Sequence, residues 1–178
     1  MTVFALAMTA VICVASVAGA GPANAAMELG RASLTTSLGH AGADAHGLWP
    51  GAESAVLMQV ANDGDTRWGS LTLEVATSGR SPLVTNPVDG LQVRVDACST
   101  RWDGAGGGER PTCDGRIDVL VPTQPVLDGS YALTGLSSAL PGGSDTLRVT
   151  IALPRHAGNE MQGLSTDLDY VVRADQLA

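Results

Sequence analysis

From Ala26 onward the chain alternates apolar and polar side chains with a period of two, and this pattern constrains the fold more than any other feature. Successive side chains of a β-strand point to opposite faces, so the alternation is typical of strands with one buried and one wet face. Turn residues interrupt it at spacings typical of an all-β protein. The expected strands cover residues 31–38, 55–62, 68–77, 91–97, 117–121, 131–136, 147–153 and 164–173, and residues 135–139 are expected to form a short helical turn.

Strands that bury only one face belong to antiparallel sheets, because parallel sheets are normally covered on both sides. Strands in this number predict an all-β fold, an antiparallel two-sheet sandwich of the jelly-roll type. No repeat, charge block or linker divides residues 26–178, which are therefore expected to form a single domain. Trp49 and Trp68 flank expected strands, and we expect both rings to anchor the core.

The first 25 residues predict a signal peptide. Residues 1–20 are almost continuously apolar, and Ala23-Asn24-Ala25 places small residues where signal peptidase reads them, so cleavage is expected after Ala25. The mature protein is then secreted or located at the cell surface, with no stable membrane anchor. An uncleaved membrane anchor is the alternative, because the apolar run is nearly long enough to span a bilayer.

The charge of the chain excludes several functions. With 10 basic and 18 acidic residues the net charge is −8, which argues against nucleic-acid binding because that needs a basic face. Every basic residue is Arg, so Schiff-base catalysis and a P-loop lysine are excluded. The nucleophile motif G-x-S-x-G and the zinc motif H-E-x-x-H are also absent. The sequence thus predicts no catalytic residue.

Cys98 and Cys113 are the two cysteines of the mature chain. An even pair in an exported protein favours a disulfide, and closing a loop of this length stabilises a fold by roughly 3 kcal/mol. The enclosed segment is rich in glycine and contains Trp102. An exposed Trp102 in this loop would be a contact point for a surface partner or carbohydrate, so an extracellular binding module is one functional alternative.

Metal binding has two weak sets of candidates, and no cofactor is otherwise expected. His40, His46 and His156 would have to converge with a carboxylate to hold zinc, since their spacing matches no zinc motif. Asn62-Asp63-Gly64-Asp65 is interpreted first as a turn, because Asn, Asp and Gly tolerate left-handed backbone. Calcium bound by Asp63 and Asp65 is the alternative interpretation.

Two segments near the ends of the mature chain resemble one known family. Residues 48–64 run Leu-Trp-Pro-Gly-Ala-Glu-Ser and then Val-Leu-Met-Gln-Val-Ala-Asn-Asp-Gly, and residues 153–164 run Leu-Pro-Arg-His-Ala-Gly-Asn-Glu-Met-Gln-Gly-Leu. Both are similar to the opening and closing elements of the TasA/camelysin family of exported bacterial surface proteins. The middle of the chain, with both cysteines, has no counterpart in that pattern.

The resemblance implies a jelly-roll protein exported to the cell surface. The family includes biofilm-matrix proteins that assemble into fibres and camelysin, described as a surface metallopeptidase. We therefore expect a structural protein whose partners are further copies of itself or other matrix proteins, with a metalloendopeptidase as the alternative. Physical reasoning adds a route to assembly: residues 27–38, including Arg31, Leu34 and Leu38, could complete an open sheet edge of a neighbouring copy.

Overall fold

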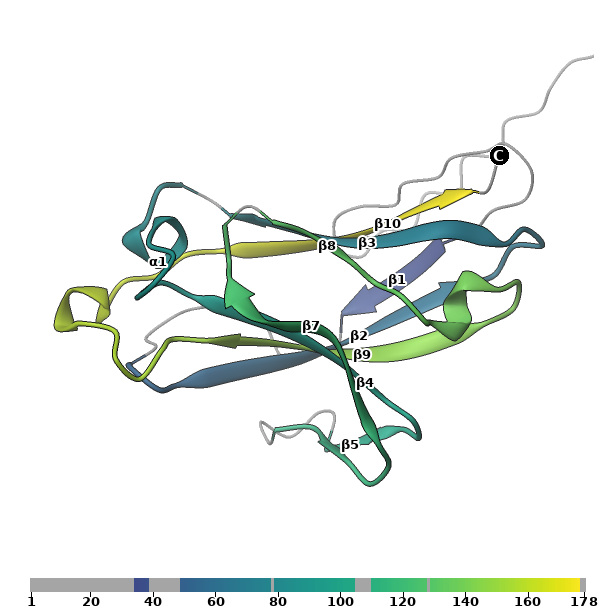
Figure 1. Cartoon of the computed structure of the whole chain (residues 1–178), viewed down its shortest axis with the longest axis horizontal. Helices are drawn as coiled ribbons and strands as arrows, with labels where there is room; N and C mark the ends of the chain where they lie inside the picture. The colour runs from purple at the N-terminus through teal and green to yellow at the C-terminus, as the bar shows by residue number, and fades with distance from the viewer. Residues whose placement is uncertain (1–33, 39–48, 78, 105–109, 128, 177–178) are drawn as a thin grey trace, which may run out of the picture.

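The computed structural model describes residues 34–38, 49–77, 79–104, 110–127 and 129–176. They form an all-β protein in which every strand pair is antiparallel (Figure 1). A five-stranded sheet has the order β1-β2-β9-β4-β7, a three-stranded sheet has the order β10-β3-β8, and β5 pairs with β6. The strands are β1 Leu34–Leu38, β2 Glu53–Asn62, β3 Trp68–Thr77, β4 Gln92–Cys98, β5 Trp102–Asp103, β6 Thr112–Cys113, β7 Ile117–Pro125, β8 Ser130–Ala132, β9 Ser144–Ala152 and β10 Leu168–Gln176.

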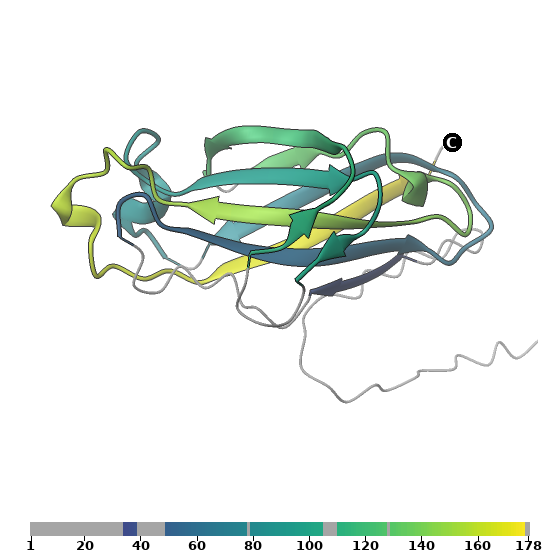
Figure 2. The same ribbon diagram turned by 90° about the horizontal axis from the view of Figure 1, so that it is seen from below.

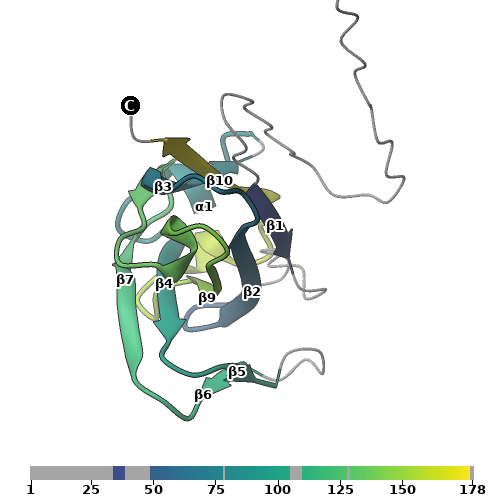
Figure 3. The ribbon, with the colours of Figure 1, turned by 90° about the vertical axis from the view of Figure 1, so that its right-hand side faces the viewer.

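The two larger sheets face each other as a jelly-roll-like sandwich, which confirms the predicted fold class (Figures 2 and 3). The chain crosses between the sheets at most connections, since β2, β4, β7 and β9 belong to the larger sheet and β3, β8 and β10 to the smaller one. Short helices lie in three connections: α1 Pro82–Thr85, η1 Ser137–Ala139 and η2 Asn159–Met161. Element η1 is the short turn expected within residues 135–139. No helix among the described residues is long and apolar enough to cross a membrane.

One hydrophobic core fills the space between the sheets. Its side chains come from the positions that the period-two pattern marks as inward-facing, and each fully buried aliphatic side chain stabilises the fold by roughly 1.5–3 kcal/mol. Helix α1 adds Leu83 and Val84, and η2 adds Met161. The strand residues include Val56, Met58 and Val60 of β2, Leu71, Leu73 and Val75 of β3, Val93 and Val95 of β4, and Leu147, Val149 and Ile151 of β9.

Strand β7 departs from the predicted alternation. Val121 is buried, as expected, but Val119 is 48% exposed and Ile117 is exposed as well. The cause is a β-bulge: Val121 lies opposite Val95 and Val119 lies opposite Asp96, so two steps along β7 match one step along β4. An extra residue in one strand reverses the faces of the side chains beyond it. Ile117 and Val119 therefore lie on the outer face of the larger sheet.

Of Trp49 and Trp68, which were both expected in the core, one is buried and the other is exposed. Trp68 is buried in the core, with 3% of its surface exposed, whereas Trp49 is 68% exposed in the turn before β2. The expectation for Trp49 was wrong because nearness to a strand in sequence does not say which side of a turn faces water. Strand ends also shift: β8 is shorter than expected, β7 is longer, and β10 begins at Leu168.

Candidate functional site

The predicted disulfide is present: Cys98 at the end of β4 is bonded to Cys113 in β6. The bond closes a small hairpin in which Trp102 pairs with Cys113 and Asp103 pairs with Thr112. Figure 3 shows this hairpin, β5–β6, lying outside the sandwich, next to the larger sheet. The disulfide therefore stabilises a hairpin that would be only weakly stable with its two short strands alone.

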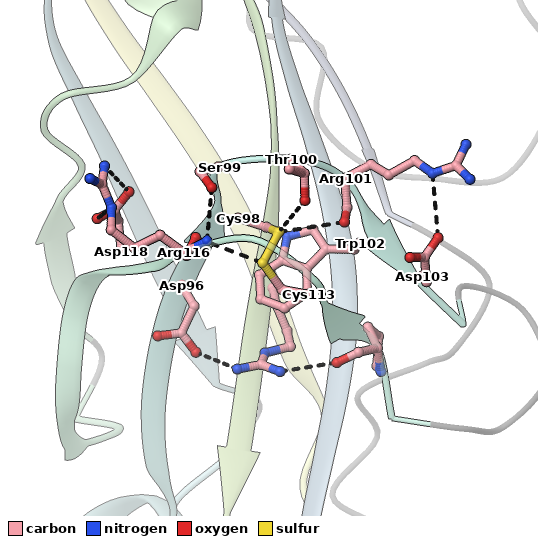
Figure 4. The surroundings of a disulfide bond; sticks show 12 residues. Asp96, Cys98, Ser99, Thr100, Arg101, Trp102, Asp103, Cys113, Arg116 and Asp118 are labelled. Carbon is pink, nitrogen blue, oxygen red and sulfur yellow. Dashed lines mark hydrogen bonds and ion pairs between the residues drawn. A yellow bond between two sulfur atoms is a disulfide. The ribbon is translucent and has the colours of Figure 1, made fainter.

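Trp102 does not face water, which corrects the expectation of an exposed contact residue. Only 6% of its surface is exposed, and its Nε1 donates a hydrogen bond of 2.9 Å to the carbonyl oxygen of Thr146 in β9. The ring lies beside the disulfide, between the hairpin and the sheet (Figure 4). Trp102 therefore ties β5–β6 to the sheet and is not available to a partner.

A buried ion pair lies beneath the hairpin, on the outer face of the larger sheet. Arg148 Nη2 donates to Asp96 Oδ2 at 2.8 Å, and Arg148 Nη1 donates to the carbonyl oxygen of Pro111 at 3.0 Å. The guanidinium of Arg148 lies 4.4 Å from the centroid of the Trp102 ring, in cation–π contact. Arg148 thus joins β9, β4 and the hairpin through three different interactions.

Asp96 is fully buried and accepts a second charged hydrogen bond, from Arg94 Nε at 2.9 Å. This hydrogen bond raises the pKa of Arg94 above its ordinary value, against the smaller lowering effect of burial. One carboxylate is therefore shared by the guanidinium groups of Arg94 and Arg148. Because Asp96 has no exposed surface, it cannot touch a bound molecule, and the cluster serves to hold the hairpin in place.

The sequence marked Asp96 and Arg148 only as polar positions of two strands. The register brings them opposite each other across β4 and β9. Asp96 and Arg148 are buried because the β5–β6 hairpin covers them. The one sequence feature that indicated an ordered segment there was the Cys98–Cys113 pair. A polar position on a strand is by itself the signature of a wet face, so the alternation could not reveal the cluster.

Of the three candidate zinc ligands, the structure describes His156. His156 Nε2 lies 3.2 Å from the carbonyl oxygen of Val88 and 3.7 Å from Asp89 Oδ1. His40 and His46 lie outside the described residues. Within the part of the chain that the structure describes, no three His, Cys, Asp or Glu side chains are grouped as a metal would require.

The segment after β2 forms the turn that its sequence predicts. Asn62 Oδ1 accepts a hydrogen bond from the backbone amide of Gly64 at 3.1 Å, and Asn62 Nδ2 donates to the carbonyl oxygen of Thr66 at 2.9 Å. Asp65 Oδ1 accepts from Thr66 Oγ1 at 3.2 Å. The buried Asn62 thus organises the turn around Asp63 and Asp65 through local hydrogen bonds.

The expected assembly segment contributes the outermost strand of the larger sheet. In β1, Leu34 lies opposite Asn62 and Leu38 lies opposite Met58, so the strand pairs with the second half of β2. Arg31 lies outside the described residues. Neither the β1–β2 nor the β2–β9 register contains a shift. This edge of the sheet is therefore regular, in contrast to the bulged β7 edge.

A weak structural likeness relates this chain to a solved protein structure. No protein-family description matches the sequence, and no curated protein matches it. Among solved structures, one described by "AvmM Catalyzes Macrocyclization in Alchivemycin A Biosynthesis" is similar, with a TM-score of 0.36 and 10% identity over 82% of this chain and 89% of that one. A likeness this distant carries no argument about fold or function. The resemblance to the TasA/camelysin family stays a prediction from the sequence.

Proposed function

We propose that this chain is an exported structural β-sandwich that builds an extracellular homopolymer by exchanging its N-terminal strand between copies. In this assembly β1 of one copy pairs with β2 of the next. The observation that supports this proposal best is the position of β1. Among the described strands it is the outermost one of the larger sheet, and its pairing partner there is β2.

Exchange of β1 preserves the backbone pairing found within one copy. The five pairs from Leu34↔Asn62 to Leu38↔Met58 are the same whether β1 comes from the same chain or from a neighbour. Exchanging an identical element is therefore a low-cost route to association. When the exchange is one-way, each copy donates one strand and receives another, so the chain of copies has open ends and grows into a fibre.

The β1 edge suits exchange better than the other edge of the same sheet. Strand β7 contains Pro122 and Pro125 and two register shifts relative to β4. Proline and bulges are the usual devices that protect an edge strand from pairing with another molecule. Strand β2 has neither, so β2 would offer a regular, fully competent edge whenever β1 leaves it.

Two further features agree with an extracellular structural role. The signal-like leader predicts export, and the Cys98–Cys113 disulfide is the kind of bond that persists in an oxidising compartment. The net charge of −8 should oppose association at neutral pH, and protonation of carboxylates in acid should relieve that repulsion. We therefore expect polymers to form more readily at acidic than at neutral pH.

The decisive experiment tests whether the β1 strand paired with β2 comes from the same chain or from a neighbouring copy. Ser37 and Gln59 are directly opposite in the β1–β2 register. One preparation of the mature protein carries Ser37→Cys and a second, with a different affinity tag, carries Gln59→Cys; both are mixed under polymerising conditions and oxidised. We expect a disulfide between the two tagged chains on a non-reducing gel. The matched control replaces Gln59→Cys by Gln162→Cys, at an exposed position in a loop, and should give little crosslink.

A deletion gives the second arm of the test. Mature protein lacking residues 26–38 should keep its β-type circular dichroism but form no sedimentable polymer. Polymers that form equally well without these residues, or equal crosslinking at Gln59 and Gln162, would contradict strand exchange.

A further inference from the structure

A groove of about 440 Å³ opens at the end of the larger sheet that lies away from β1. Its floor is Ala152, the last residue of β9, which lies in register with Glu53 of β2 on one side and Gln92 of β4 on the other. Strand β1 pairs with residues 58–62, at the opposite end of β2. The volume lies in the range of small-ligand sites, so the groove is large enough to hold a ligand of its own.

Part of the groove lining is apolar. The apolar residues come from the turn after α1, from the end of β7 and from the loop after β9, and they include Pro87, Val88, Pro125 and Pro154. Val88 is 62% exposed, the second most exposed large apolar side chain among the described residues. Such exposure costs free energy in water and would be relieved by an apolar surface of a ligand.

Polar residues also line the groove: Glu53, Gln92, Thr123, Gln124, Arg155 and His156. The side chains of Thr123, Gln124 and Arg155 make no hydrogen bond or ion pair with any residue that the structure describes. Gln92 donates from Nε2 to the carbonyl oxygen of Gly90 at 3.2 Å, and that is its one side-chain hydrogen bond to a described residue. The groove thus presents several donors and acceptors that have no partner among the described side chains.

The charges around the groove balance. Glu53 Oε2 lies 2.7 Å from Arg110 Nη1, and His156 lies 3.7 Å from Asp89. With His156 counted as neutral, the guanidinium of Arg155 offsets the carboxylate of Asp89. The Arg155 side chain lies against Gly51, where an added Cβ would meet Arg155 Cγ at 3.0 Å. A strongly anionic ligand would be repelled by the carboxylates of Glu53 and Asp89, and a strongly cationic one would be repelled by the arginines. The electrostatics therefore favour a neutral ligand.

The backbone beneath the groove is not available to a peptide. Around Ala152 the chain is paired on both sides, with β2 and with β4, so a ligand strand cannot be added there. Recognition must come from side-chain amides, hydroxyls and charged groups around an apolar floor. A sugar ring has the matching chemistry, because its C–H faces are apolar and its edge carries hydroxyl groups that both donate and accept.

We propose that this groove binds a neutral oligosaccharide. One sugar ring rests on Ala152 and against the proline and Val88 walls, and its hydroxyl groups bond with Gln92, Thr123 and Gln124. This binding does not depend on strand exchange, because it uses the other end of β2. In an extracellular protein the site would attach the chain to a polysaccharide surface.

Binding is measured with the mature protein, residues 26–178, at neutral pH by isothermal titration calorimetry and amide chemical-shift mapping. The neutral probes are cellotetraose, maltotetraose and tetra-N-acetylchitotetraose; the charged comparators are tetragalacturonate and the fully deacetylated chitotetraose. We expect at least one neutral probe to bind, to shift the amides of residues 87–92, 123–125 and 152–156, and to bind more tightly than either charged probe.

Three variants test the location. The double variant Gln92→Ala/Gln124→Ala should weaken binding about tenfold, which corresponds to the loss of one or two hydrogen bonds. Ala152→Leu should abolish binding by filling the floor. Gln162→Ala is the matched control and should bind as the unaltered protein does, and thermal unfolding shows whether each variant is folded. The proposal is overturned if no neutral probe binds at about 10 mM, if a charged probe binds most tightly, or if folded groove variants bind normally.

Discussion

The guanidinium of Arg148 lies 4.4 Å from the ring centroid of Trp102, so a strand of the sheet and a residue of the stapled hairpin share one buried contact. Trp102 is not part of the main core between the sheets. It forms a separate small core on the outer face of the larger sheet, together with the disulfide and the Arg148–Asp96 ion pair. The hairpin is therefore held by packing, charge and a covalent bond at once.

Trp102→Ala should destabilise the protein by about 3–5 kcal/mol, because it removes a buried aromatic side chain. Trp102→Phe keeps most of the packing but loses the hydrogen bond to Thr146, and should cost about 1 kcal/mol from that bond, plus a smaller packing loss. Urea unfolding followed by circular dichroism measures both free energies. An alanine variant as stable as the unaltered protein would show that the ring is not buried.

Asp96→Asn should cost about 3–5 kcal/mol, because it leaves the buried guanidinium of Arg148 without its counter-charge. The double variant Asp96→Leu/Arg148→Met replaces both charges by apolar groups and should be more stable than Asp96→Asn. Both are measured by denaturant unfolding under the same conditions. If the double variant were the less stable of the two, the ion pair would itself supply net stability.

Cys98→Ser/Cys113→Ser should lower the free energy of unfolding by roughly 3 kcal/mol, as expected for a loop of this length. Adding a reductant to the unaltered protein should lower its stability by a similar amount, and the same reductant should leave the serine variant unchanged. Thermal unfolding with and without reductant checks this. Equal sensitivity of both proteins to reductant would show that the effect does not come from this bond.

The bulge in β7 predicts opposite outcomes for two valines two positions apart. Val119→Thr should change stability by no more than about 0.5 kcal/mol, because Val119 is an exposed residue of the outer face. Val121→Thr should cost about 1–3 kcal/mol, because it buries a hydroxyl group in the core. Chemical unfolding of the two variants compares them directly. Similar costs at both positions would mean that the strand is regular and the bulge absent.

The sequence by itself determined the fold class and most of the strands. The expectations for β2, β3, β4 and β9 were nearly correct, and so was the pairing of Cys98 with Cys113. These features depend on the side-chain period of a strand and on the number of cysteines, which are local properties of the chain. Leu34 and Leu38 were also placed in a strand, although its pairing partner could not be read from the sequence.

Only the tertiary structure decided whether several polar and aromatic side chains face water. The sequence pattern placed Trp102 in a loop where its ring could be exposed, and Trp49 in the core. The structure buries Trp102 and exposes Trp49. It also turns Val119 outward through the bulge and buries Asp96 and Arg148 under the hairpin. Each outcome depends on a segment distant in the sequence that covers, or fails to cover, the residue. Local alternation carries no information about such a cover, so burial at these positions follows from the fold as a whole.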